Sequence, residues 1–291
     1  MADDVRKIAT GAQPPSAQPA VTGANQARVD SRAERARRTA YRGRFALLYF
    51  LLAMIAGIAI GATIVLVGRG SPAPAPPWSD WQPVGSAQRR TAQIADRIAG
   101  TYRLPTGHQL DTVTYAGPPT VTGPDGTTFQ VRAIAVRPDT SHGAAEANDI
   151  DSFSADGTVM YTLCGLGDRC AIGEGQASNE RGALLRREAL ELGLYTFKYV
   201  DGVSSTVVLL PPRPDGQAAT AVFLERGDVK SQLSRPLDQT LTAPLTPGIG
   251  EMTDTELQTV EGITRPRLYQ YSYLQAQDGS PVMVLDPAIG S

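Results

Sequence analysis

The sequence has few of the side chains that bind metals or carry out redox chemistry. Among its 291 residues are only two cysteines, Cys164 and Cys170, and two histidines, His108 and His142. A structural zinc site needs about four such ligands, and the histidines lie far from the cysteines along the chain. Redox-active cysteine pairs normally have two residues between them, whereas the five residues GLGDR separate this pair. We therefore expect neither a metal site nor a redox centre.

Signatures of nucleotide binding and of common hydrolases are also lacking. Residues 165–170, GLGDRC, begin like a dinucleotide-binding loop, but Cys170 stands where the third glycine is required. The sequence contains no P-loop, serine-hydrolase elbow or zinc-protease motif. It thus predicts no cofactor and no catalytic residue.

The two histidines could become catalytic only through the fold. A catalytic histidine needs an orienting carboxylate. Asp111 or Asp149 could supply one to His108 or His142 if the fold brought them together. The alternative, which we favour, is that both are exposed loop histidines.

Residues 146–156, EANDIDSFSAD, gather the acidic side chains Glu146, Asp149, Asp151 and Asp156. A calcium-binding loop places oxygen ligands at alternate positions and a glycine at the sixth. Here Phe153 takes the third position and that glycine is missing. We expect a solvated acidic loop.

The C-terminal part of the chain lacks a surplus of positive charge. From Gly70 onward the sequence has 17 basic and 25 acidic residues, a net charge of −8. Nucleic acids and anionic membrane surfaces attract basic proteins, so neither is expected as a partner of this part.

One long apolar run stands out. Residues 45–68 contain no charged residue and no proline, and as a helix they reach about 36 Å, enough to cross a hydrocarbon core. A cleaved signal peptide has a shorter apolar stretch followed by a small-residue cleavage site, whereas SPAPAPP follows here. We interpret residues 44–68 as an uncleaved signal anchor.

The arginines around this run predict its orientation. Those on the N-terminal side form a dense cluster, whereas the other side carries only Arg69 before Arg89. The positive-inside rule then places the N-terminus in the cytoplasm and everything after the run across the membrane. The arginines closest to the run are Arg35, Arg37, Arg38, Arg42 and Arg44.

Composition divides the rest of the chain. Residues 1–43 have almost no large apolar side chains and are expected to be a disordered basic tail. Residues 69–77 are proline-rich and predict a stiff stalk. Residues 78–291 have a globular composition and are long enough for one core. Trp78 and Trp81 are expected to open this domain.

The predicted location outside the cytoplasm indicates the state of the two cysteines. In an oxidising compartment, two cysteines separated by a short glycine-containing loop are best paired with each other. We predict a structural disulfide between Cys164 and Cys170; free thiols are the alternative.

Periodicity and turn residues predict an α+β domain with antiparallel hairpins. Two amphipathic patterns indicate helices, near residues 86–102 and 178–200, and the second is apolar over more than half its circumference, so we expect it to be buried. A capping box at Thr253–Glu256 predicts a third, short helix.

Asp-Gly pairs in GPDGT, SADGT and QDGSP predict hairpins, and parallel βαβ alternation is not expected. The predicted strands are Leu110–Tyr115, Thr128–Val136, Thr158–Leu163, Thr206–Leu210, Thr220–Glu225, Leu268–Gln275 and Val282–Leu285.

Two patterns suggest contact surfaces. Ala53, Gly57 and Gly61 recur every four residues on one side of the apolar helix, a spacing that permits dimerisation in membranes but also occurs in anchors that stay monomeric. Tyr269, Tyr271 and Tyr273 alternate along one strand face. They form either an exposed ligand platform or, as we favour, part of the core.

The apolar run predicts a membrane protein. Arginine outnumbers lysine, as is typical of GC-rich bacterial genomes, so we expect a bacterial source. We expect the outer domain to be a non-catalytic interaction or structural module that binds an envelope protein or a cell-wall polymer. Lipid surrounds the anchor, and a homodimer could form through it. The alternatives are a tethered envelope hydrolase and an accessory subunit of a larger membrane complex.

Overall fold

The computed structural model describes residues 45–63, 77–138, 149–212, 219–242 and 246–288. Its contacts divide the chain into two units, Met1–Pro74 and Ala75–Ser291. The predicted basic tail with its five orienting arginines, the end of the predicted anchor and most of the predicted stalk lie outside the described residues.

The first unit contains an apolar helix, Phe45–Thr63, which is long and apolar enough to cross a membrane. Ala53, Gly57 and Gly61 lie within it. A Cβ atom added at Gly57 or Gly61 would meet nothing within 4 Å. Dimerisation through this face stays a prediction.

The second unit is an α+β domain built on a mixed eight-stranded sheet with the strand order β1-β6-β7-β8-β9-β10-β4-β5. A separate two-stranded sheet pairs β2 with β3. The strands are β1 (Asp111–Ala116), β2 (Thr120–Thr122), β3 (Thr128–Gln130), β4 (Ala133–Val136), β5 (Asp151–Ser154), β6 (Thr158–Gly165), β7 (Ser205–Leu209), β8 (Thr220–Glu225), β9 (Leu268–Gln275) and β10 (Pro281–Pro287). The predicted α+β class is confirmed.

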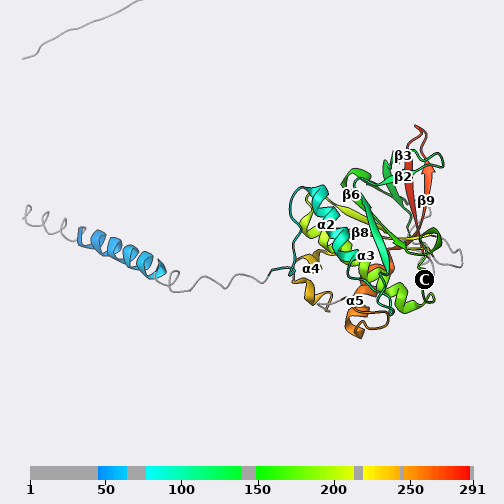
Figure 1. Ribbon diagram of the computed structural model, residues 1–291. Coiled ribbons are helices and arrows are strands. Elements are labelled where there is room, and N and C mark those ends of the chain that lie inside the picture. Colours follow the sequence, from blue (N-terminus) through cyan, green and yellow to red (C-terminus); the bar gives the residue numbers. More distant parts are fainter. Residues whose placement is uncertain (1–44, 64–76, 139–148, 213–218, 243–245, 289–291) are drawn as a thin grey trace, which may run out of the picture. The chain divides into compact units, whose positions relative to one another are not determined.

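Three main helices cover one face of the sheet, and Figure 1 shows them together on one side of the domain. They are α2 (Ala87–Ala99), α3 (Asn179–Tyr199) and α5 (Asp254–Thr264). Each begins at a side-chain cap: the hydroxyls of Ser86, Ser178 and Thr253 accept hydrogen bonds from backbone N–H groups three residues ahead. Shorter turns are α4 (Lys230–Leu233), η2 (Ala155–Gly157), η3 (Asp168–Cys170), η4 (Leu237–Gln239) and η5 (Arg265–Arg267).

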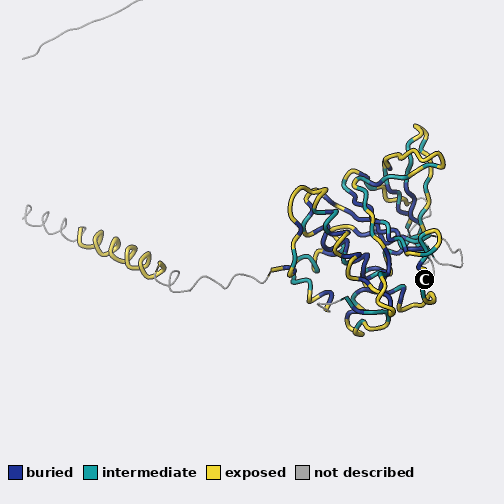
Figure 2. The backbone as a smooth tube through the Cα atoms, viewed as in Figure 1, coloured by how far each residue is buried: buried dark blue, intermediate teal, exposed yellow. Residues whose placement is uncertain are grey.

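The larger core lies between these helices and the sheet. Helix α3 is buried on most of its circumference, as the dark tube in Figure 2 shows. Its fully buried side chains include Leu184, Leu190, Leu194 and Phe197, and they pack with Ile94 and Ile98 of α2. Burial of each such side chain is worth about 1.5–3 kcal/mol. The middle of α3 is therefore held rigidly.

A second core lies on the other face, where the sheet curls over itself. The rings of Phe153 in β5 and Phe223 in β8 have centroids 5.0 Å apart, although three strands separate them in the sheet. Buried residues of this core include Ile134, Val207, Met283 and Leu285.

Four expectations need correction. Strand β6, helix α3 and strand β7 form a parallel βαβ unit, which the sequence analysis did not expect. The predicted strand Thr128–Val136 is two strands, β3 and β4, in different sheets. Asp151–Ser154 is strand β5 paired with β4, not part of an acidic loop. SADGT forms the 3-10 helix η2 instead of a hairpin, because the Ser154 hydroxyl accepts a hydrogen bond from the Asp156 N–H and closes a tighter turn.

The other turn predictions agree with the structure. The β2–β3 and β9–β10 hairpins turn at Gly126 and Gly279, whose φ angles of +82° and +84° are the positive values that an Asp-Gly turn requires. The tyrosine row of β9 is half-buried and packs against the second core.

Candidate functional site

A cleft of about 810 Å³ lies on the helical side of the domain. Four stretches that are far apart in the sequence line it: residues 77–80, the last turn of α2 with Thr101, the middle of α3, and residues 236–242 with Thr246. A backbone hydrogen bond of 2.7 Å from the Leu237 N–H to the Trp78 carbonyl ties the first stretch to the last. The opening residues of the domain therefore form one wall.

Aromatic rings make this wall rigid. The Trp78 ring lies edge-on to Tyr195, with centroids 5.3 Å apart, and Trp81 lies 5.5 Å from the same tyrosine. The Trp78 indole donates a hydrogen bond of 3.2 Å to the carbonyl of Gln232, and the Arg97 guanidinium stacks 4.8 Å from the Trp81 ring centre. Aromatic and cation–π contacts of this kind add about 0.5–1.5 kcal/mol each, so the wall is preformed.

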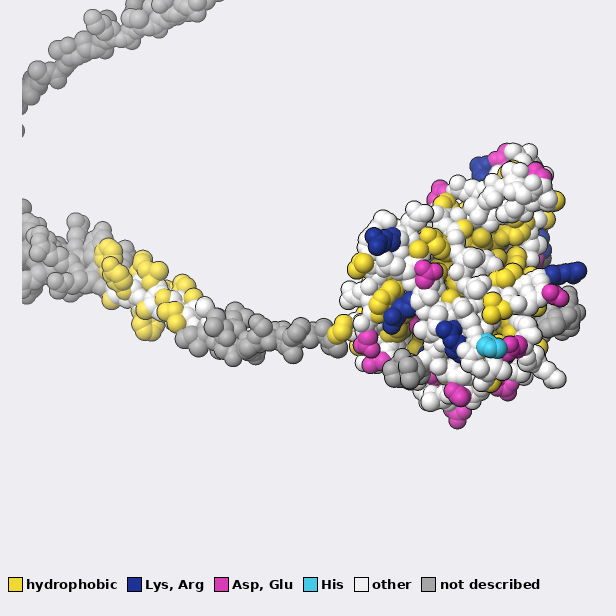
Figure 3. Space-filling model, in the orientation of Figure 1, with side chains coloured by type: hydrophobic (Ala, Val, Ile, Leu, Met, Phe, Trp, Pro, Cys, Tyr) yellow, Lys and Arg dark blue, Asp and Glu magenta, His cyan; other side chains and the backbone are white. Residues whose placement is uncertain are grey.

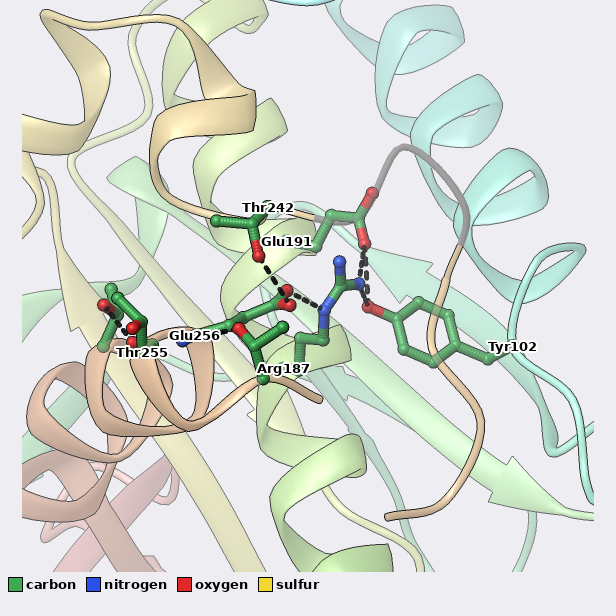
Figure 4. Close-up of polar contacts among 8 residues, drawn as sticks. Tyr102, Arg187, Glu191, Thr242, Thr255 and Glu256 are labelled. Carbon is green, nitrogen blue, oxygen red and sulfur yellow. Dashed lines mark hydrogen bonds and ion pairs between the residues drawn. The ribbon is translucent and has the colours of Figure 1, made fainter. Parts of the chain in front are cut away.

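The floor of the cleft is a network around Arg187 (Figure 4). Its Nε donates to Glu256 at 2.7 Å, and its Nη1 donates to the Tyr102 hydroxyl at 2.6 Å and to Glu191 at 3.1 Å. Tyr102 donates in turn to the same oxygen of Glu191 at 2.7 Å. Thr242 donates to the second oxygen of Glu256 at 3.1 Å. Helices α3 and α5 are thereby joined through buried charges.

Burial and neighbouring charges shift the titration of this floor. Desolvation opposes the charge of Arg187, but the oxygens of Tyr102, Glu191 and Glu256 outweigh it and raise the pKa of the guanidinium. Burial, reinforced by the charge of Glu191, raises the pKa of the Tyr102 hydroxyl well above its usual range. The floor therefore keeps a charged arginine and a neutral tyrosine.

Behind the floor lies a second pair, Asp111 of β1 and Glu188 of α3, both fully buried. None of their four carboxyl oxygens has a hydrogen-bond donor among the described residues. The two groups nonetheless lie within hydrogen-bonding reach of each other. Because two ionised carboxylates can only accept hydrogen bonds and repel each other, this contact requires a proton between them. Burial raises the pKa of Asp111 to about 7, and burial together with the charge of Asp111 raises that of Glu188 well above its usual range.

No family model, curated protein or solved structure matches the chain.

Of the histidines singled out by sequence, only His108 lies in the described residues. Its Nδ1 is 2.6 Å from an oxygen of Glu174, whose other oxygen accepts a hydrogen bond from Thr106. The partner is thus Glu174 and not Asp111, and the imidazole is two-thirds exposed on the surface. Hydrogen bonds from His108 and Thr106 lower the pKa of Glu174.

The remaining sequence candidates are dispersed. The structure joins Cys164 and Cys170 by a disulfide at the end of β6, where Gly165 lies so close to the Ala171 carbonyl that a Cβ atom would clash with it. Asp151 begins β5, and Asp156 accepts a hydrogen bond from Gln130. The described residues hold no group of three or more metal-binding side chains. His142 and Glu146 lie outside the described residues.

Sequence reasoning missed most of the cleft. The helical spacing of Arg187 and Glu191 allows them to pair one turn apart, but it does not reveal their further partners Tyr102 and Glu256. A usable signal was present: the apolar arc of α3 passes through Arg187, Glu188 and Glu191, and charged residues within a buried arc must find partners.

Proposed function

We propose that this chain is a single-pass, membrane-anchored protein of the bacterial envelope. Its domain outside the cytoplasm acts as a non-catalytic interaction module that binds its partner through the cleft. The apolar helix Phe45–Thr63 supports the anchor, and the arginine distribution supports the orientation. The Cys164–Cys170 disulfide is in keeping with an oxidising compartment.

The observation that carries the proposal is the preformed state of the cleft. Trp78 is held by its indole N–H and by ring contacts, and Arg187 is held by three hydrogen-bond partners within the domain itself. A site whose side chains are already ordered loses little conformational entropy on binding. A volume of about 810 Å³ also falls within the range of natural ligand sites.

Site-specific crosslinking in native membranes tests the proposal. A photo-reactive amino acid replaces Thr101, an exposed residue of the cleft wall, or Thr122, an exposed residue of β2 that does not line the cleft. We expect a discrete adduct with an envelope protein or polymer from position 101 and none from position 122. Adducts of equal yield from both positions, or none from position 101, would contradict the cleft as the binding site.

A tethered hydrolase is the second candidate, favoured by the His108–Glu174 pair. A carboxylate at 2.6 Å could orient the imidazole as a general base. In that case His108→Gln abolishes hydrolysis of envelope material by the purified chain, whereas Thr101→Trp in the cleft leaves it intact. The interaction module predicts no such hydrolysis in either variant.

The accessory-subunit alternative differs in its purification behaviour. A subunit of a larger membrane complex co-purifies in mild detergent with the same proteins in fixed ratio. A free-standing module is recovered alone or with a ligand that salt or competitor removes.

A further inference from the structure

We propose that the cleft binds a neutral saccharide through the Arg187–Glu191 pair on its floor. This ligand class rests on the proposed function, because it assigns an occupant to the same cleft.

The floor presents an unused donor beside an unused acceptor. The Nε and Nη1 atoms of Arg187 donate hydrogen bonds to its protein partners, whereas its Nη2 atom makes no hydrogen bond within the described part of the chain. Glu191 accepts both of its bonds through Oε2, and the described residues offer no donor to Oε1. Figure 4 shows these two atoms without dashed lines. A sugar hydroxyl can accept from a guanidinium and donate to a carboxylate at once, so neighbouring hydroxyls match this pair.

The charges of the cleft argue against an anionic ligand. Its walls and floor carry the carboxylates Asp80, Glu191 and Asp238 against Arg97 and Arg187. Glu256 further neutralises Arg187 from behind. Anion-binding sites need a surplus of donors and positive charge, and Figure 3 likewise shows basic and acidic side chains interspersed over the face it displays, without a large patch of one sign.

The rest of the lining alternates apolar and neutral polar groups. Ile98, Leu237 and Leu241 offer apolar contact, and Thr101 and Gln239 offer hydroxyl and amide groups. A pyranose ring has the same mixed character, with C–H groups on its faces and hydroxyls at its edge. A purely apolar ligand would instead leave the donors and acceptors of the floor unsatisfied, which opposes its binding.

Equilibrium binding by the full-length chain in lipid nanodiscs tests this inference. The neutral probes are oligomers of glucose, mannose, arabinose-galactose and N-acetylglucosamine, and the charged probes are inorganic phosphate, a uronic-acid oligomer and an oligolysine peptide. We expect at least one neutral oligosaccharide to bind and the charged probes not to compete. Thr101→Trp, which fills the cleft, and Glu191→Gln, which removes the acceptor charge, should each weaken binding about tenfold or more. Thr122→Trp should leave it unchanged.

The outcomes separate this inference from the proposed function. If no neutral oligosaccharide binds, or if Thr101→Trp binds as tightly as the unmodified chain, the saccharide assignment is wrong. A crosslink from position 101 to an envelope protein would then still support the interaction module. If an oligosaccharide binds and mass spectrometry shows that it is cleaved, the ligand class stands and the non-catalytic function is wrong. Because Glu191 supports Tyr102, unchanged thermal unfolding of Thr101→Trp keeps the test valid even if Glu191→Gln is destabilised.

Discussion

The buried carboxyl groups of Asp111 and Glu188 keep a proton bound in the core of the folded domain. The two groups lie within hydrogen-bonding reach of each other, their oxygens have no other donor among the described residues, and the charges of Glu191 and Arg187 act on Glu188. Two ionised carboxylates in this position would repel each other and lack solvation, so the folded domain holds a proton that the unfolded chain releases above about pH 4.

This proton makes stability depend on pH. Because the folded-state pKa of Asp111 is raised to about 7, and that of Glu188 is raised as well, the stabilisation is fully present below about pH 4 and is lost as the pH rises through 7. We expect the free energy of unfolding to fall by a few kcal/mol between pH 5 and pH 8, at about 1.4 kcal/mol per pKa unit. Glu188→Gln supplies a permanent amide donor, so it should flatten this dependence and stabilise the domain at pH 8.

Thermal unfolding of the full chain followed by tryptophan fluorescence measures this effect. Asp238→Asn, a change at an exposed cleft residue, serves as the control and should keep the slope of the unmodified chain. If the free energy of unfolding of Glu188→Gln depends on pH as steeply as that of the control, the assignment of a shared proton is wrong.

Two neighbouring arginines differ sharply in their energetic role. The Arg187–Glu256 pair is buried, with 2% and 1% of the side chains exposed, whereas Arg186 and Glu261 are 17% and 27% exposed. Removing one member of a buried pair leaves an unpaired charge and costs about 3–5 kcal/mol. Arg187→Ala should therefore lower the free energy of unfolding by that amount, and Arg186→Ala by about 1 kcal/mol or less. Equal losses in chemical denaturation would show that the floor network is not a buried ion-pair site.

At the scale of elements, the sequence predicts what depends on local chemistry. Helix α3 was predicted from its apolar periodicity, α5 from the capping box that begins at Thr253, and two hairpins from the Asp-Gly pairs that end at Gly126 and Gly279. Strand β5 was missed because its residues, Asp151–Ser154, are mostly polar and exposed, and only their pairing with β4 makes them a strand. The third Asp-Gly pair misled for a related reason: Gly157 packs against Ser204, where a Cβ would come within 2.7 Å of the hydroxyl oxygen.

The disulfide loop after β6 gives a prediction at this scale. Cys164 and Cys170 close a short loop, and loss of a bridge over such a loop costs about 2 kcal/mol in the chain-entropy account. We expect the purified chain to show no thiol that alkylates before reductant is added. The double variant Cys164→Ser, Cys170→Ser should unfold at a lower temperature but keep the same fold. Two cysteines that label freely in the native protein would contradict the pairing.

At the scale of the whole molecule, the cleft could not be read from the sequence. Its lining comes from four stretches between Pro77 and Thr246, and only the fold brings them together. The division of the chain was accessible, because a charge-free run followed by a proline-rich segment is a property of composition alone. The proposed function depends on both the cleft and the division of the chain, because the module must be anchored and its domain must lie where envelope polymers occur.

The most direct test of this account is the topology of the full chain in the native membrane. A reporter that is active only in the cytoplasm is fused at Met1 or at Ser291, and a second reporter that needs an oxidising compartment is fused at the same positions. The account predicts that the cytoplasmic reporter works only at Met1 and the oxidising-compartment reporter only at Ser291, because the arginines before residue 45 hold that end inside. Cytoplasmic activity at Ser291 would place the cleft and the disulfide in the wrong compartment and contradict the account.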